Sequence, residues 1–287
     1  MTAHLSDNAY GKSRVRVTKV QREPAGRHEL FEFDIDIQLR GGFDACYLSG
    51  DNTGVLPTDT MKNTVYALAA QHRIDSAEQF ALLLSGHFAG HPQLPHLSGV
   101  RIDLRQARWK RVRDENGKEH PWAFVNGGTE RRTCRVERGR AGSPAAVWGG
   151  IEDLLLLKTT DSAFVNFVRD AYTTLPDASD RIFATAVRAT WRYAPGEHDW
   201  NGAGDAIRAA MIGRFAGHKS LAVQQTLHAM GEAALAACAA IEEIEIWMPN
   251  QHRIPTDLRP MGLENRNEVF VTTAEPFGLI GGTIRRT

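Results

Sequence analysis

Residues Phe31–Arg40 read Phe-Glu-Phe-Asp-Ile-Asp-Ile-Gln-Leu-Arg and form the clearest structural pattern in the chain. Apolar side chains occupy the odd positions and polar side chains the even positions, which is typical of a strand with one buried face. A shorter valine pattern over 15–20 precedes this run, and Pro24-Ala25-Gly26 supplies a turn between the two. The sequence therefore predicts an antiparallel hairpin with one face in water.

The spacing of apolar residues changes from two to a helical period after this hairpin. Apolar stripes over 61–69 and 80–88 predict two helices, the first of which starts at Thr58. Strand patterns return at 100–104 and 122–125. The first half of the chain thus reads strand, strand, helix, helix, strand, strand.

The second half of the chain repeats this order. Its patterns predict, along the chain, strands over 151–160 and 182–192, helices over 207–215 and 223–238, and strands over 244–248, 268–271 and 279–284. The alternation in the second of these strands slips at Ala186–Val187, which predicts a β-bulge there.

Two copies of one strand and helix order predict an α+β protein that arose by duplication. We expect two tandem ββααββ units, residues 1–140 and 141–287, each an antiparallel sheet with helices on one face. The edges of such open sheets need protection, so strand-to-strand association between copies of the chain is expected.

The composition excludes several classes of partner. Lys plus Arg and Asp plus Glu both total 34, so there is no net charge to attract nucleic acid or an anionic membrane surface. The sequence contains no hydrophobic run long enough to span a bilayer. Three widely spaced cysteines suit a reducing interior better than a disulfide framework. We expect a cytoplasmic protein that binds neither nucleic acid nor membranes.

Sequence motifs for common cofactors do not occur. The chain has no Gly-x-Gly-x-x-Gly, Walker loop, Cys-x-x-Cys or His-Glu-x-x-His. His91 and His96 could form a metal pair, but two solvated imidazoles in a surface loop are the favoured interpretation. An enzyme of this kind would perform its chemistry with side chains alone.

Five stretches of the chain resemble one known family, the urate oxidases (uricases). They are Tyr10–Lys12, Gly50–Asn52 leading into Pro57–Thr64, much of Leu157–Ile182, Leu221–Thr226 and Met248–His252. The resemblance follows the same order along nearly the whole chain. It implies the tunnelling fold, in which two tandem ββααββ units form each subunit, dimers close their sheets into a barrel, and two barrels stack as a tetramer.

The same resemblance implies a chemical activity. Urate oxidases convert urate, dioxygen and water into 5-hydroxyisourate and hydrogen peroxide with no metal or organic cofactor. The partners implied are urate, dioxygen and three further copies of the chain, with active sites at subunit interfaces. Two alternatives stay open: a tunnelling-fold enzyme that acts on pterins with zinc, and a purine-binding protein without catalytic activity.

The resemblance assigns urate binding to Thr58, Asp59, Phe164, Arg181, Val223, Gln224 and Asn250. Arg181 and Gln224 would clamp the edge of the anion, and Phe164 would supply the face on which the ring stacks. On the residues alone, a plainer interpretation exists for each of these three. Arg181 could be a solvated or salt-bridged arginine, Gln224 a surface residue and Phe164 a core residue.

Proton transfer is assigned by the resemblance to Lys12, Thr58 and His252, with Lys12 as the base. Thr58 also reads as a helix N-cap with Asp59 in the first turn, and a helix N-terminus suits an anion. Asn250 would hold dioxygen or water above the ring. In the family, Lys12, Thr58 and Asp59 would come from one subunit and the other residues from its neighbour.

Overall fold

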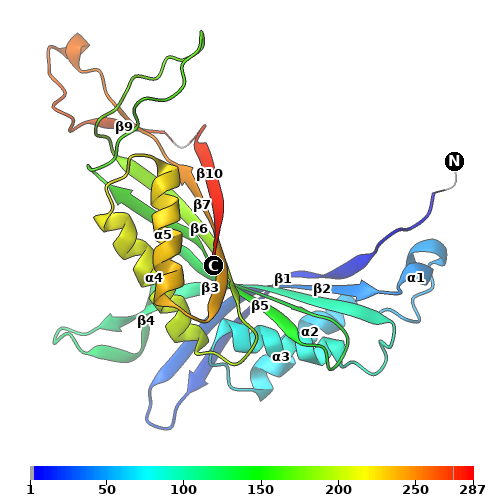
Figure 1. Cartoon of the computed structure of the whole chain (residues 1–287). Coiled ribbons are helices and arrows are strands. Elements are labelled where there is room, and N and C mark those ends of the chain that lie inside the picture. Colours follow the sequence, from blue (N-terminus) through cyan, green and yellow to red (C-terminus); the bar gives the residue numbers. More distant parts are fainter. Residues whose placement is uncertain (1–2, 274) are drawn as a thin grey trace. The chain divides into compact units, whose positions relative to one another are not determined.

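Long antiparallel strands and paired helices build both units of the computed structural model, which describes residues 3–273 and 275–287 (Figure 1). The chain divides into Met1–Gly150 and Ile151–Thr287. Strand β5 (Ala145–Lys158) carries the chain from the first unit into the second. The domain boundary predicted after residue 140 falls in the turn that precedes β5.

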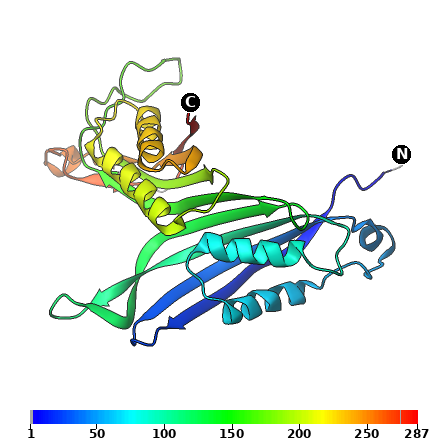
Figure 2. The ribbon, with the colours of Figure 1, turned by 60° about the horizontal axis from the view of Figure 1, so that its bottom comes forward.

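The first unit follows the predicted order of elements. Its antiparallel strands are β1 (Ala9–Arg22), β2 (His28–Gly41), β3 (Leu97–Arg113) and β4 (Glu119–Arg138), each paired with the next. Helices α2 (Thr58–Gln71) and α3 (Ala77–Ala89) cover one face of these strands (Figure 2). A short helix that the sequence patterns did not predict, α1 (Asp44–Ser49), follows β2.

The core of this unit lies between the helices and the odd-numbered residues of the run 31–40. Phe33, Ile35, Ile37 and Leu39 are at most 3% exposed, and Phe33 stacks on Phe80 of α3 with ring centroids 5.7 Å apart. The even-numbered residues of β2 lie on the opposite face, where charged side chains of neighbouring strands pair with one another. The predicted division of β2 into a buried and a wet face is confirmed.

The second unit repeats the arrangement with additions near its end. Its main elements are β6 (Phe183–Tyr193), α4 (Trp200–Gly217), α5 (Val223–Ala237), β7 (Ile241–Asn250) and β10 (Gly278–Arg285). Strand β7 pairs antiparallel with both β6 and β10, and α5 packs on β7 and β10. With β5 in front of these elements, the second unit has the same ββααββ order as the first, which confirms the predicted α+β fold.

The segment between β7 and β10 departs from the sequence prediction. The strand expected over 268–271 is β9 (Phe270–Thr272), which pairs with β8 (Arg253–Pro255) in a separate two-stranded ribbon. A 3-10 turn, η1 (Arg259–Met261), lies between β8 and β9. Sequence periodicity missed β8 and its pairing with β9, because strands of three residues are too short to establish an alternation.

The bulge predicted at Ala186–Val187 in β6 is wrong. Phe183, Thr185 and Val187 are all buried, and the pairing of β6 with β7 keeps one register until it shifts between Arg192 and Tyr193. The interpretation failed because Thr185 is fully buried despite its hydroxyl group and Ala184 is buried as well, so the apolar residues at the start of this strand do not mark a single face.

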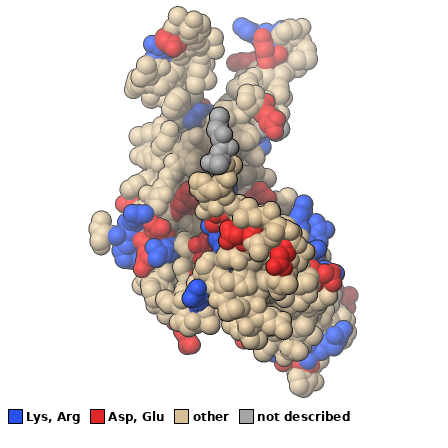
Figure 3. Space-filling model, turned by 90° about the vertical axis from the view of Figure 1, so that its right-hand side faces the viewer, with Lys and Arg blue, Asp and Glu red and all other residues tan. Residues whose placement is uncertain are grey.

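Charges of both signs are interspersed over the face of the molecule shown in Figure 3. Mixed charge on this face agrees with the equal totals in the sequence. Within the described part of the chain, no helix has the length and apolar character needed to cross a bilayer.

Candidate active site

Backbone hydrogen bonds join three segments of the second unit around Phe164 and Arg181. The N–H and C=O of Phe164 pair with those of Ala178 at 2.8 and 3.0 Å. The N–H of Arg181 donates to the Ser162 carbonyl at 2.7 Å, and Ala163 N–H donates to the Ser220 carbonyl at 2.7 Å. Because Ser220 lies just before α5, these bonds bring Phe164, Arg181 and the start of α5 into one neighbourhood.

Arg181 is a half-buried arginine that faces an aromatic ring. Its guanidinium carbon lies 5.2 Å from the centroid of the Phe164 ring. Its Nε is buried, and no hydrogen-bond partner for it exists among residues 3–273 and 275–287. Burial lowers the pKa of Arg181. A buried donor of this kind ordinarily has a partner, so the geometry leaves Arg181 ready to bind an acceptor from outside the chain.

The carboxylate of the neighbouring Asp180 does not pair with the Arg181 guanidinium but binds residues earlier in the chain. Its carboxylate accepts hydrogen bonds from Thr160 Oγ1 at 2.7 Å and from Ser162 N–H at 3.3 Å. The hydrogen bond from Thr160 is the main cause that lowers the pKa of Asp180. Asp180 is therefore an ionised carboxylate that ties Thr160 to Ser162. Arg181 is itself partly buried, so its interpretation as a solvated surface residue is wrong.

Phe164 combines packing with exposure. Its ring stacks on Phe167 with centroids 4.8 Å apart and an interplanar angle of 9°, while the residue remains partly exposed. The core-packing interpretation thus holds in part. An aromatic ring fixed by a neighbour and partly open to solvent can accept a planar ligand.

Val223 and Gln224 are the first two residues of α5. Val223 is only 4% exposed, whereas Gln224 is exposed. The side chain of Gln225 turns back and accepts the Leu221 N–H at 3.0 Å, so Gln225 rather than Gln224 serves the helix start. The first backbone N–H groups of a helix lack partners inside the helix and attract anions, which leaves the Gln224 amide and this helix end suited to a ligand.

Asn250 and His252 lie at the end of β7. Asn250 pairs in register with Thr185 of β6 and with Gly278 of β10. The N–H of Gln251 donates to the Ala184 carbonyl at 2.9 Å, which continues the contact toward the start of β6. Since Arg181 lies two residues before the start of β6, the strand pairing places Asn250 and His252 beside the segment that carries Arg181.

The first unit holds Lys12, Thr58 and Asp59. Lys12 lies on β1 opposite Ile37, and Thr58 begins α2. The hydroxyl oxygen of Tyr10 accepts the Leu56 N–H at 2.9 Å, which ties β1 to the segment just before α2. Tyr10 also packs edge-on against Phe43 with centroids 4.7 Å apart. Tyr10 is thus the structural link between Lys12 and Thr58, a role that the sequence stretch Tyr10–Lys12 did not reveal.

Thr58 is not the N-cap of α2. The helix starts at Thr58 and the capping position is Pro57, with φ −57° and ψ 137°. Proline fixes φ near this value and suits the residue that precedes a helix. The helix therefore starts at Thr58, one residue earlier than it would if Thr58 were the cap. The Thr58 hydroxyl is therefore not committed to a helix cap.

Asp59 is exposed and paired within α2. Its carboxylate accepts from Lys62 Nζ at 2.5 Å and from Asn63 Nδ2 at 2.9 Å. The hydrogen bond from Lys62 holds the pKa of Asp59 below its usual range, and the positive charge of Lys12 acts in the same direction. The positive charge of Lys12 thus stabilises the ionised carboxylate of Asp59 in the first turn of α2.

The expected site residues therefore form two groups in the two units. Lys12, Thr58 and Asp59 belong to the first, and Phe164, Arg181, Val223, Gln224, Asn250 and His252 to the second. Each group is assembled by contacts within its own unit.

The histidines of the loop after α3 differ from expectation. His96 is partly buried, its Nε2 lies 2.9 Å from the Gly54 carbonyl oxygen, and its ring packs edge-on against Phe43. The interpretation of two solvated imidazoles is therefore wrong for His96. In the described ranges, no group of three or more His, Cys, Asp or Glu side chains could hold a metal ion.

Comparison with known proteins gives the whole chain a family context. The family model described as uricase matches residues 8–137 and 147–281. A uricase from Dictyostelium discoideum is 38% identical and covers 99% of this chain and 98% of its own length. A uricase from Arthrobacter globiformis is 42% identical over 98% of this chain and 90% of its own length. The crystal structure of uricase from Arthrobacter globiformis superposes with a TM-score of 0.92 and 41% identity, covering 100% of this chain and 96% of that one.

Proposed function

Because the chain belongs to the uricase family, we propose that it is a urate oxidase that needs no cofactor. Its substrates are urate, dioxygen and water, and its products are 5-hydroxyisourate and hydrogen peroxide. Urate gives up two electrons and dioxygen accepts them together with two protons, so the reaction balances without an external reductant.

One observation carries the binding half of this proposal: Arg181 has a buried Nε without a partner in the described chain and lies over the Phe164 ring. Urate is planar and anionic at neutral pH. A planar anion stacked on Phe164 would meet the guanidinium along one edge, where charge-assisted hydrogen bonds are strongest. The Gln224 amide, which offers both a donor and an acceptor, and the Val223 N–H would hold another edge.

The chemical half of the proposal uses the remaining residues. Lys12, relayed through Thr58 and His252, removes the second proton from urate and leaves an electron-rich dianion. The dianion reduces dioxygen and forms a peroxide adduct at a ring carbon. The bond between the ring carbon and oxygen then breaks, and the leaving peroxide takes up protons returned by the Lys12 relay and is released as hydrogen peroxide. Water held by Asn250 and Thr58 then adds to the ring and supplies its hydroxyl group.

We further propose that the complete site needs two subunits, with Lys12, Thr58 and Asp59 supplied by one and the remaining residues by its neighbour. Two dimeric barrels would make a homotetramer. Exposed apolar side chains next to the second group support an interface there: Val168 is 94%, Tyr172 90% and Leu279 62% exposed. Such side chains on a folded protein mark surfaces that bind another chain.

A direct assay tests the activity. Purified protein, urate, air and a metal chelator are mixed while the ultraviolet absorbance of urate, dissolved oxygen and peroxide are followed together. We expect equal loss of urate and oxygen with equal gain of peroxide. Binding of urate without any loss would favour the inactive purine-binding alternative, and an activity that disappears with the chelator would favour the zinc-dependent alternative.

A matched pair of variants tests the role of Lys12. Lys12→Met should keep urate binding nearly intact and lower turnover by orders of magnitude, because the variant lacks the base but keeps the binding group of the second unit. Lys110→Met changes an exposed lysine on β3 and should behave as wild type. Equal loss of binding and turnover in Lys12→Met would contradict the assignment of Lys12 as a base.

A further inference from the structure

Strand β1 contains one extra residue between Lys12 and Val15. Lys12 pairs with Ile37, but Val15 pairs with Ile35, so three residue steps on β1 correspond to two on β2. Arg14, within this bulge, has φ 57°, a left-handed conformation that is uncommon for residues other than glycine. The bulge is therefore a defined irregularity that must be held in place by its surroundings.

The bulge determines which face of the sheet Lys12 occupies. Val15 is 3% exposed and shares the buried face with Ile35. In an uninterrupted strand, successive side chains alternate, so Lys12 would lie on the face opposite to Val15. The extra residue restores Lys12 to the face of Ile37, which the helices cover. This is the face on which α2 begins at Thr58.

The carboxylate of Asp36 holds the bulge. Its Oδ1 accepts hydrogen bonds from the Ser13 hydroxyl and from the Arg14 N–H, the latter at 2.8 Å. Its Oδ2 accepts from Arg105 Nη1 on β3 at 3.1 Å. Asp36 thus binds both residues of the bulge and is itself fixed by the neighbouring strand.

Gly11 fixes the backbone on the other side of Lys12. A Cβ atom at this position would lie 1.8 Å from the Ile37 carbonyl oxygen, so β1 and β2 approach here more closely than any side chain allows. Lys12 therefore sits between a close strand contact at Gly11 and a clamped bulge at Ser13–Arg14.

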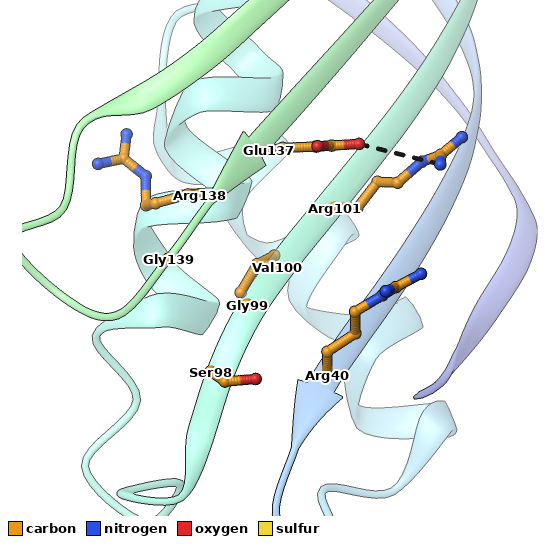
Figure 4. A pocket seen from close by; sticks show the side chains of 8 residues that line it. All are labelled: Arg40, Ser98, Gly99, Val100, Arg101, Glu137, Arg138 and Gly139. Atoms are coloured by element: carbon orange, nitrogen blue, oxygen red, sulfur yellow. Dashed lines mark ion pairs between the residues drawn. The ribbon is translucent and has the colours of Figure 1, made fainter. Parts of the chain in front are cut away.

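A second carboxylate on the same face provides a natural control. Asp103 of β3 lies directly opposite Asp36 and accepts from Arg101 Nε at 2.6 Å and from Arg135 Nε at 2.8 Å. Arg101 also pairs with Glu137, and Figure 4 shows Arg101 and Arg40 extending to one side of the strands and Arg138 to the other. Asp103 thus belongs to the same charged face as Asp36, but its hydrogen bonds go to Arg101 and Arg135.

We infer that Asp36 is a positioning residue for the reaction: by holding the bulge at Ser13–Arg14, its carboxylate turns Lys12 toward Thr58 and so sets the rate of proton transfer without contact with urate. This inference rests on the proposed function, in which Lys12 is the base. It concerns turnover rather than substrate binding, because the binding group of the second unit is built without Asp36.

The test compares Asp36→Ala, Asp36→Asn and Asp103→Ala in the full-length protein, with Lys12→Met alongside. For Asp36→Ala, kcat should fall about ten- to a hundredfold, the cost of misplacing a catalytic group by about 1 Å. The urate Kd, measured by anaerobic titration, should stay near the wild-type value. Asp36→Asn keeps an oxygen that accepts from Ser13 and Arg14 and should retain most of kcat. Asp103→Ala should lose a similar amount of thermal stability while kcat stays unchanged.

The outcomes separate this inference from the proposed function. Full kcat in Asp36→Ala together with an inactive Lys12→Met would overturn the inference and leave the base assignment standing. An equal fall of kcat in Asp36→Ala and Asp103→Ala would also overturn it, because the effect would then be general to the sheet. Full activity in Lys12→Met would remove the base assignment and the inference with it. Should Asp36→Ala fold poorly, Ser13→Ala removes one clamp bond and should lower kcat by a smaller factor.

Discussion

Single residues of the site differ in how far the sequence revealed them. The resemblance singled out Arg181, and the structure adds the reason why this arginine is unusual: burial, an unpaired Nε within the described chain, and the ring of Phe164. Thr58 was expected to cap α2, but Pro57 holds that position. Neither feature can be predicted from a residue type, because both depend on which neighbours the fold supplies. The assigned roles of these residues in catalysis stay predictions.

Arg181→Lys should weaken urate binding roughly ten- to a hundredfold, because a lysine cannot reproduce two parallel charge-assisted hydrogen bonds. Titration of urate under anaerobic conditions measures the Kd. Arg188→Lys makes the same change at an exposed arginine of β6 and should leave Kd unchanged. Unaltered binding in Arg181→Lys would show that this guanidinium does not hold the anion.

Asp36 should also make stability depend on pH in the acid range. Burial raises the pKa of Asp36, but the hydrogen bonds from Ser13, Arg14 and Arg105 outweigh burial and leave the pKa below its ordinary value. A carboxyl with a depressed folded-state pKa contributes stability above its unfolded pKa of about 4, and this contribution disappears as the pH falls through the folded-state pKa. The free energy of unfolding of Asp36→Asn, measured by denaturant titration from pH 6 downward, should fall less steeply below about pH 4 than that of wild type.

At the scale of elements, hydrophobic periodicity was informative where elements are long. The helices α2 and α3 and the strand β2 follow from their patterns because several turns or alternations agree. Periodicity missed β8 and its pairing with β9, and it also missed the bulge in β1. The bulge lies at Ser13–Arg14 and follows another polar residue, Lys12, so the hydrophobic pattern does not reveal the change of face.

The contact between α3 and β4 depends on a buried ion pair. Arg132 Nη2 donates to both carboxylate oxygens of Glu78, at 2.9 and 2.8 Å, and the Glu78 side chain is fully buried. Arg132→Met should lower the free energy of unfolding by about 3–5 kcal/mol, because it leaves a buried carboxylate without its partner. The double variant Glu78→Met with Arg132→Met should recover much of this loss. Chemical denaturation measures the free energy of unfolding of the single and the double variant. Equal losses of stability in both would contradict the prediction that the cost comes from the unpaired Glu78 carboxylate.

At the scale of the whole molecule, the order of the hydrophobic patterns along the sequence predicted the repeat of ββααββ units. Short sequence motifs indicated how much of the chain resembles the family. How the two groups of site residues would combine in one site follows only from the family resemblance, because hydrophobic periodicity describes packing within a single chain. The proposal of shared sites between subunits therefore needs a test that involves more than one chain.

Mixing two inactive variants provides that test. Lys12→Met and Arg181→Ala, each inactive alone, are unfolded together and refolded as an equal mixture. If each site takes Lys12 from one subunit and Arg181 from its neighbour, random pairing should restore about a quarter of the wild-type sites. A mixture of Lys12→Met and Thr58→Ala should stay inactive, because both residues come from the same side of the interface. Recovery in neither mixture would show that a single chain supplies the whole site.

The extra residue in β1 has a consequence for how this strand can vary in length. The number of residues between Lys12 and Val15 sets the face of the sheet on which the lysine lies, and the hydrogen bonds of Asp36 to Ser13 and Arg14 hold that arrangement. Removing or adding one residue there would invert the lysine to the far side of the sheet, whereas a change of two would return it. Under the proposed mechanism, in which Lys12 is the base, an odd change in strand length here would abolish activity even in a chain that keeps its fold and every named side chain.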